Sequence, residues 1–189
     1  MMTKNLLLIT GENQLTVINV NSHSLVRTIS VPNSSWINAA CLLTSNKLLT
    51  VDNNKAICFY DILERKIKAT ISNISKYDGC RAWFIMMKKD LLLIPGSNQL
   101  SIINTNEYKL IRTINVPNAS TITGVCLLNK DMLLTGDYSE TIRQWKIEGD
   151  NLVMTSKKEK ANERSIGTVL KIGNGLIITG DDDGYIKVW

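Results

Sequence analysis

The chain has 189 residues, of which 44% are hydrophobic and 21% are charged, and its formal net charge is +5. This composition excludes a disordered chain and is typical of a globular protein with a sizeable core. Apolar runs such as LLLI at 6–9 and FIMM at 84–87 are far too short to cross a bilayer. We therefore expect no targeting segment, no membrane partner and a cytoplasmic protein.

Five short apolar runs, each ending in a turn, follow one another along the chain. They read LLLITGEN, KLLTVDNN, LLLIPGSN, MLLTGDYS and LIITGDDD. The residues before the turns are separated by 40, 45, 40 and 44 positions. A period of 40 to 45 residues with turns rich in Gly or Asp is typical of four-stranded β-propeller blades.

Each period contains four strand-like runs rich in Ile, Val, Leu and Thr. In residues 36–71 these runs are WINAACLL, KLLTV, AICFYDI and KIKATI, separated by the turns TSN, DNN and LER. No stretch keeps an apolar period of 3.6 residues, so we expect few helices. The pattern favours antiparallel sheets packed around an axis over a β-helix or a helical repeat.

A longer repeat lies over this period. Residues 1–60 align with 86–145 without a gap, and 31 of the 60 positions are identical. The stretch QLTVINVNSHSLVRTISVPN at 14–33 thus returns as QLSIINTNEYKLIRTINVPN at 99–118. The shift between the two copies corresponds to two successive periods, which is expected of a repeat architecture.

Three hairpins resemble the second hairpin of WD repeats, the tryptophan–aspartate repeats of β-propellers. They are LLTVDNNKAICFYD at 48–61, LLTGDYSETIRQW at 133–145 and IITGDDDGYIKVW at 177–189. The resemblance implies strands labelled a to d from the centre of each blade outward. Hairpins 11–19 and 96–104 depart from the pattern, and the Gly-His pair before strand a is absent. We therefore expect the family's Asp-His-Ser/Thr-Trp hydrogen-bond network to form only in part.

The strand pattern predicts an all-β fold, a partial and open β-propeller of four-stranded antiparallel blades. We expect one domain over 1–189 with three complete blades and two incomplete terminal ones. The first period lacks strand a and the last lacks strand d, so we expect an arc belonging to a longer chain. Its open blade faces would then associate with another chain or with the rest of the propeller. The expected blades are 1–35 (partial), 36–78, 80–118, 121–158 and 165–189 (partial).

Antiparallel strands place the d-to-a loops and the b-to-c turns on one face of the blades. This face carries the longer and more varied loops, where binding residues usually lie. Trp, Tyr and Arg dominate the energetic centres of protein interfaces. The candidate partner-binding residues are therefore Trp36, Tyr77, Arg81, Tyr138 and Arg164. Trp145 and Trp189 are instead expected in the core.

The sequence offers no convincing catalytic, cofactor or metal site. The four cysteines lack metal-ligand spacing, and His23 is the single histidine. Asp181-Asp182-Asp183-Gly184 lacks the spaced ligands of a calcium loop and is better explained as a turn with Asx hydrogen bonds. We therefore expect no enzyme activity in this chain, no cofactor and no metal.

These observations favour a non-catalytic WD-repeat scaffold that binds proteins or peptides through its loop face. One alternative is a platform for RNA or a ribonucleoprotein, although basic residues are not interleaved with aromatics and nucleic acid is an unlikely partner. The other alternative is a sensor domain appended to an enzyme outside this chain.

Overall fold

Short strands make up nearly all of the regular structure in this chain. The computed structural model describes residues 6–31, 36–44, 46–52, 56–72 and 85–189. Within these residues the only other regular element is a 3₁₀ turn at Gly173–Gly175, which confirms the prediction of few helices. Strands dominate because branched Ile, Val and Thr side chains crowd the runs between turns and pack well on a pleated surface.

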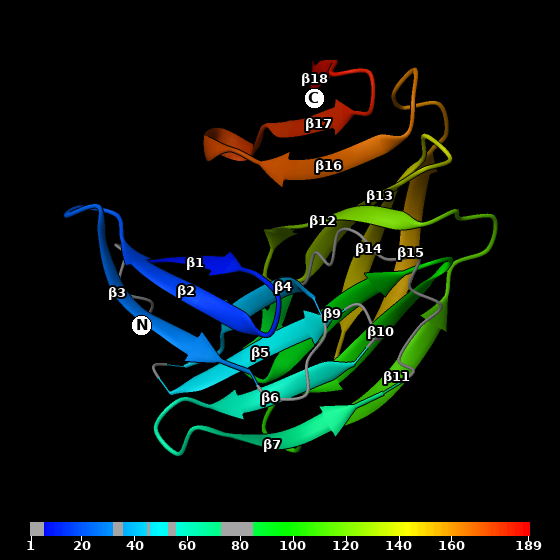
Figure 1. Cartoon of the computed structure of the whole chain (residues 1–189). Coiled ribbons are helices and arrows are strands. Elements are labelled where there is room, and N and C mark those ends of the chain that lie inside the picture. The colour runs from blue at the N-terminus through cyan, green and yellow to red at the C-terminus, as the bar shows by residue number, and fades with distance from the viewer. Residues whose placement is uncertain (1–5, 32–35, 45, 53–55, 73–84) are drawn as a thin grey trace. The chain divides into compact units, whose positions relative to one another are not determined.

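Within the described residues the strands, labelled in Figure 1, form five antiparallel sheets, three with four strands and two with three. This confirms the all-β fold and the prediction of three complete blades with an incomplete one at each end. The four-stranded sheets contain β4 (Ile37–Leu42), β5 (Lys47–Asp52), β6 (Ile57–Asp61) and β7 (Lys66–Ile71); β8 (Ile85–Lys88), β9 (Leu91–Gly96), β10 (Gln99–Asn104) and β11 (Lys109–Asn115); and β12 (Ile122–Asn129), β13 (Met132–Asp137), β14 (Ile142–Glu148) and β15 (Asn151–Lys158). The three-stranded sheets contain β1 (Leu6–Thr10), β2 (Gln14–Asn19) and β3 (Ser24–Ser30), and β16 (Ile166–Lys171), β17 (Ile177–Asp181) and β18 (Ile186–Val188).

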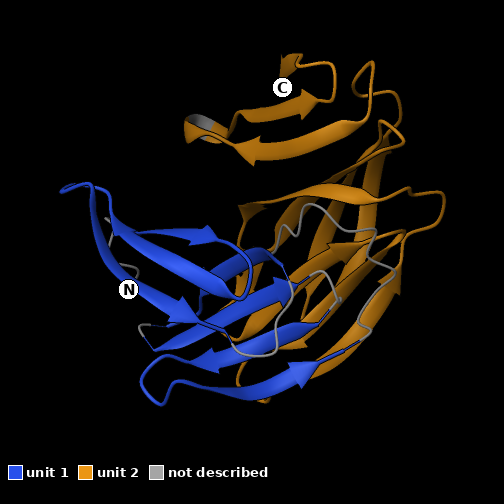
Figure 2. Cartoon of the chain, in the orientation of Figure 1, with its two compact units in different colours: residues 1–74, 79–82 blue, residues 75–78, 83–189 orange. Residues whose placement is uncertain are grey.

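The chain divides into two compact units, shown in Figure 2. The first unit holds β1 to β7, and β1 packs beside β4 within it. The second unit holds β8 to β18, and its β12 packs against both β9 and β16. Neighbouring sheets of a unit therefore meet through their inner strands, in the order that the sequence predicts. The assignment of all five blades to one domain stays a prediction.

The long internal repeat is preserved in the pairing of the strands. The β2–β3 ladder shifts register between Val17 and Ile18, and the β10–β11 ladder shifts between Ile102 and Ile103, the positions aligned with them in the repeat. The ladders β6–β7 and β14–β15 also carry their bulges at matching positions, after Phe59 and after Gln144. Because a bulge sets the twist of its strand, the repeated halves share geometry as well as sequence.

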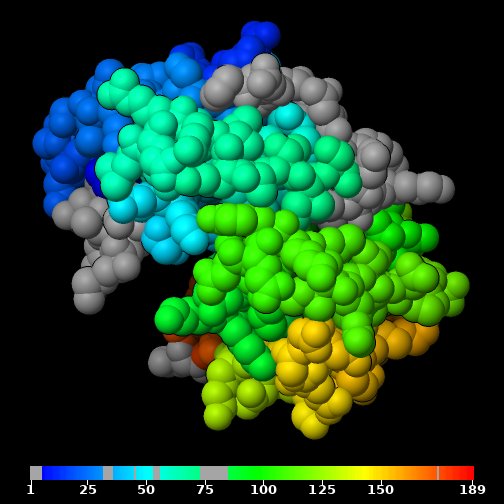
Figure 3. Space-filling view, turned by 90° about the horizontal axis from the view of Figure 1, so that it is seen from below, coloured from blue at the N-terminus to red at the C-terminus, as the bar shows by residue number. Residues whose placement is uncertain are grey.

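The central strands of the four-stranded sheets are largely buried, whereas the outer strands are more exposed. Every residue of β13 after Met132 is buried, which explains its continuous apolar run. The outer strand β7, read as KIKATI, alternates exposed Lys, Lys and Thr with half-buried Ile, Ala and Ile. Figure 3 shows the surface formed by β7 (teal) in the first unit and by β11 (green) in the second.

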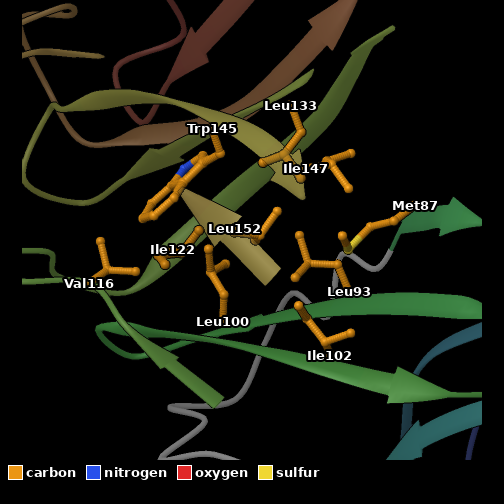
Figure 4. Close-up of a cluster of buried hydrophobic side chains, with 10 residues drawn as sticks. All are labelled: Met87, Leu93, Leu100, Ile102, Val116, Ile122, Leu133, Trp145, Ile147 and Leu152. Carbon is orange, nitrogen blue, oxygen red and sulfur yellow. The ribbon is translucent and has the colours of Figure 1, made fainter. Parts of the chain in front are cut away.

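A dry core fills the space between the sheets β8–β11 and β12–β15 (Figure 4). Leu93, Leu100 and Ile102 contribute from one sheet, and Leu133 and Trp145 contribute from the other, each at most 3% exposed. Burial of a side chain of this size contributes roughly 1.5–3 kcal/mol. Apolar packing between these two sheets therefore stabilises the second unit.

The two three-stranded sheets expose apolar side chains on strands that lie at a sheet edge. Leu7 and Ile9 of β1 are 49% and 46% exposed, and Ile186 and Val188 of β18 are 70% and 62% exposed. A strand at a sheet edge has neighbours on one side only, so its side chains cannot be covered as those of β13 are.

Candidate functional site

Turns and loops at one end of the second unit are joined into a continuous backbone surface. The backbone amide of Ala161 donates to the carbonyl of Glu140 at 2.8 Å. The Ser165 hydroxyl donates to the carbonyl of Tyr138 at 3.1 Å, and the amide of Asp182 donates to the Ser165 carbonyl at 3.1 Å. These bonds link the β13–β14 turn, the β15–β16 loop and the β17–β18 turn. We call residues 138–141, 159–165 and 182–185 the loop surface of the second unit.

This surface presents two of the residues that the sequence singles out. Tyr138 is 42% exposed although its backbone is held by the bond from Ser165. The Arg164 side chain is 66% exposed, and its Nε donates to Asp183 at 2.9 Å. Tyr138 and Arg164 therefore stand on turns that are cross-linked to each other, and both side chains remain accessible to a partner.

Trp36 lies at the corresponding place in the first unit. Its side chain is 53% exposed, and the residue forms an isolated antiparallel bridge with Glu12 in the β1–β2 turn. The next amide, of Ile37, donates to the carbonyl of Gly11 at 3.1 Å. A d-to-a connection and a b-to-c turn thus meet here as predicted. The other two candidates, Tyr77 and Arg81, lie outside the described residues.

Aspartates at the starts of the b-to-c turns hold those turns closed. The Asp181 carboxylate accepts the amide of Tyr185 at 2.9 Å, and Asp52 accepts that of Ala56 at 3.0 Å. Asp137 accepts from the amide and hydroxyl of Ser139 at 2.9 and 2.7 Å. The Asx hydrogen bonds predicted for the Asp-rich turn at 181–184 are therefore confirmed.

A hydrogen-bond chain runs beneath the loop surface in the last sheet. The indole of Trp189 donates to Thr179 at 3.0 Å, and the Thr179 hydroxyl donates to Oδ1 of Asn162 at 2.8 Å. The Asn162 amide nitrogen then donates to Asp181 at 3.3 Å. Asn162 thus stands where the WD-repeat network has histidine, so the network is complete here with one substitution. We had expected a partial network because the Gly-His pair is missing, but the amide supplies the same donor and acceptor.

In the preceding sheet, β12–β15, the aspartate of the b-to-c turn is paired with an arginine instead of an asparagine. The indole of Trp145 donates to Thr135 at 3.0 Å, as Trp189 does to its threonine. Asp137, 0% exposed, is paired with the guanidinium of Arg143, which is 3% exposed and also donates to the carbonyl of Asn118 at 3.2 Å. Sequence reasoning missed both Arg143 and Asn162, because each reaches its partners only through the fold.

The two tryptophans expected in the core differ in burial. Trp145 is 3% exposed, which confirms the prediction for that residue. Trp189 is 36% exposed, so the prediction was wrong for it. Its strand β18 lies at the edge of a three-stranded sheet, and the Lys158 ammonium covers one face of the ring at 4.2 Å from its centroid.

The cysteines of the described region are poorly suited to nucleophilic chemistry. Burial raises the pKa of Cys41 to about 12 and that of Cys126 to about 11. Burial also raises the pKa of the Cys58 thiol. A thiol with such a pKa is almost entirely protonated at neutral pH, and the thiolate is the reactive form.

The described ranges contain no group of three or more His, Cys, Asp or Glu side chains arranged to hold a metal ion. Among the same residues, no helix has the length and apolar character needed to span a membrane.

Curated proteins similar to this chain include WD repeat-containing proteins, whereas no family model matches it. WD repeat-containing protein 55 from Homo sapiens is 25% identical over 185 residues, covering 96% of this chain and 47% of that protein. Dynein axonemal assembly factor 10 from Bos taurus is 31% identical over 123 residues, covering 60% of this chain and 34% of that protein. The chain therefore spans about half the length, or less, of the curated relatives it matches.

Solved structures share the fold over nearly the whole chain. The WD40 β-propeller domain of Doa1 superposes with a TM-score of 0.77 at 19% identity, covering 99% of this chain and 61% of that one. A chain of the mitotic checkpoint complex gives a TM-score of 0.78 at 14% identity, covering 98% of this chain and 60% of that one. The five antiparallel sheets are thus the blades of a β-propeller. The chain is therefore similar in sequence to WD repeat-containing proteins and in fold to WD40 β-propellers.

Proposed function

We propose that this chain is a non-catalytic scaffold that assembles protein complexes through its loop surfaces. WD-repeat relatives and propeller neighbours support a protein-interaction scaffold as the general kind of function. The observation that carries the proposal is the loop surface of the second unit, where Tyr138 and Arg164 are exposed on turns held by backbone hydrogen bonds.

The chemistry of this surface suits protein recognition. A tyrosine and an arginine offer a large apolar area, a hydroxyl and a planar set of donors to a partner. Because the turns that carry them are already fixed by hydrogen bonds, little backbone entropy is lost on binding. Trp36 in the first unit, together with Tyr77 and Arg81, completes the set of proposed contact residues.

The proposal is tested by quantitative affinity purification of the full-length protein from the cells that express it. We expect Tyr138→Ala with Arg164→Ala to lose a subset of partners, and Trp36→Ala to lose an overlapping or separate subset. Leu25→Ala is the control, because Leu25 is 64% exposed on the outer strand β3, away from the b-to-c turns. If all variants fold and every partner is retained, these surfaces do not carry the function.

A further inference from the structure

The first unit contains a cavity that lies away from the loop residues considered so far. Its volume is about 610 Å³, within the range of ligand-binding pockets. One wall is formed by residues 27–30 of β3, and the other by Tyr60 of β6 together with Ile62, Leu63 and Arg65 from the segment that follows it. The cavity therefore lies between the outer parts of two neighbouring sheets of the same unit.

The floor of the cavity is apolar and well packed. Ile29, Tyr60 and Ile62 line it, and each is at most 7% exposed because it also belongs to the core of the first unit. Leu63 stands at the rim with 71% of its surface exposed. Such a surface suits an aliphatic or aromatic side chain, which gains by leaving water.

Two arginines line the same cavity without a carboxylate to neutralise them. Among the residues that the structure describes, neither Arg27 nor Arg65 forms an ion pair. The nearest acid in the sequence, Glu64, is taken by Lys66 at 2.6 Å and Lys68 at 2.5 Å. These two hydrogen-bonded ammonium groups lower the pKa of Glu64 to about 2.

The internal repeat supplies a natural comparison. In the register of the repeat, Arg27 has its counterpart in Arg112, and the two arginines pair with Val17 and Ile102 at matching places in their ladders. The following hairpins differ, because Asp61 pairs with Lys66 across a turn at 62–65, whereas Glu148 pairs with Asn151 across a turn at 149–150. The second unit therefore repeats Arg27 but not the turn that carries Leu63 and Arg65.

We infer that the cavity between β3 and the β6–β7 turn binds an acidic linear segment of a partner protein. Its carboxylates would pair with Arg27 and Arg65, and an apolar side chain between them would cover Leu63 and the cavity floor. This inference deepens the proposed scaffold function and rests on it. A peptide fits better than RNA, because the one aromatic ring in the cavity, that of Tyr60, is 5% exposed and cannot stack a base.

The test uses an arrayed library of eight-residue peptides that combine Asp or Glu with one Leu, Ile, Phe or Tyr in every order. A matched library carries Asn or Gln in place of the acids. We expect the purified chain to bind a set of acidic peptides, with affinity that falls as salt rises.

We expect Arg27→Glu with Arg65→Asn to lower the affinity for those peptides at least about tenfold. Asparagine suits position 65 because the backbone there has φ of 54°.

Arg112→Glu is the matched control and should leave the acidic peptides bound as before. The inference is overturned if acidic peptides bind no better than their neutral counterparts, or if Arg27→Glu with Arg65→Asn still binds them. It is also overturned if a uridine oligonucleotide binds the chain as tightly as the acidic peptides do and loses affinity in the same variant, Arg27→Glu with Arg65→Asn. If the loop variants lose partners but the chain binds no acidic peptide, the acidic-segment inference is rejected and the proposed scaffold function stands. No loss in the loop variants would reject the proposed loop function instead.

Discussion

At the scale of single residues, the buried ion pair of Arg143 and Asp137 should be sensitive to mutation. Arg143→Met would leave the Asp137 carboxylate buried with no cation, although its bonds from Ser139 and Thr141 remain. We expect a loss of about 3–5 kcal/mol in the free energy of unfolding, measured by urea denaturation.

Lys146→Met provides the control for this loss. Lys146 forms an ion pair with Glu148 at 2.8 Å, but its side chain is 54% exposed, so its removal should leave the free energy of unfolding nearly unchanged. Adding Asp137→Asn to Arg143→Met should recover part of the stability, because an amide is less costly to bury unpaired than a carboxylate. Equal losses for Arg143→Met and Lys146→Met would contradict this account.

The same residue scale shows where sequence reasoning stops. The Asp turns and the exposed Tyr138 could be predicted, because turn chemistry and loop position are local properties. The role of Asn162 in the hydrogen-bond chain could not be predicted, because Asn162 lies 17 residues before Thr179 and contacts it only in the folded chain. Trp189 was placed in the core from the hairpin pattern alone, yet its burial depends on how many strands its sheet contains.

At the scale of elements, the close approach of β12 and β16 depends on Gly124. A Cβ atom added at Gly124 would lie 2.6 Å from the backbone nitrogen of Val169, and backbone cannot yield cheaply. We expect Gly124→Ala to push β16 away and to cost about 1–3 kcal/mol, measured by thermal and urea denaturation. Gly173→Ala is the matched control, since an added Cβ there meets nothing within 4 Å. If the midpoints of thermal and urea denaturation are unchanged in Gly124→Ala, then β12 and β16 can move apart without loss of stability.

Most element boundaries were readable from the sequence because the apolar runs and turn residues alternate so regularly. The four runs predicted in 36–71 match β4 to β7 closely. The blade expected at 80–118 has β8 at Ile85–Lys88 as its first described strand, and the positions before that strand lie outside the described ranges. The cavity lined by Arg27 and Arg65 was not foreseen, because it forms only when two sheets lie side by side.

At the scale of the whole chain, stability should be graded from the central strands to the edges, because each sheet is stabilised mainly by contacts with its neighbours. All residues of β13 after its first are buried, whereas Ile186 and Val188 of β18 are 70% and 62% exposed. In hydrogen exchange of the 189-residue chain read by mass spectrometry, we expect amides of β13 and β9 to exchange slowest and those of β18 among the fastest.

Trp145→Ala sharpens this prediction. The indole lies in the core between β8–β11 and β12–β15, so its loss should raise exchange in those two sheets far more than in β1–β3, which belong to the first unit. We expect Trp145→Ala to lower the free energy of unfolding by about 3–5 kcal/mol, because removal of the indole leaves a large cavity. If exchange instead rises equally in every strand, the chain unfolds as one cooperative body and the graded picture is wrong.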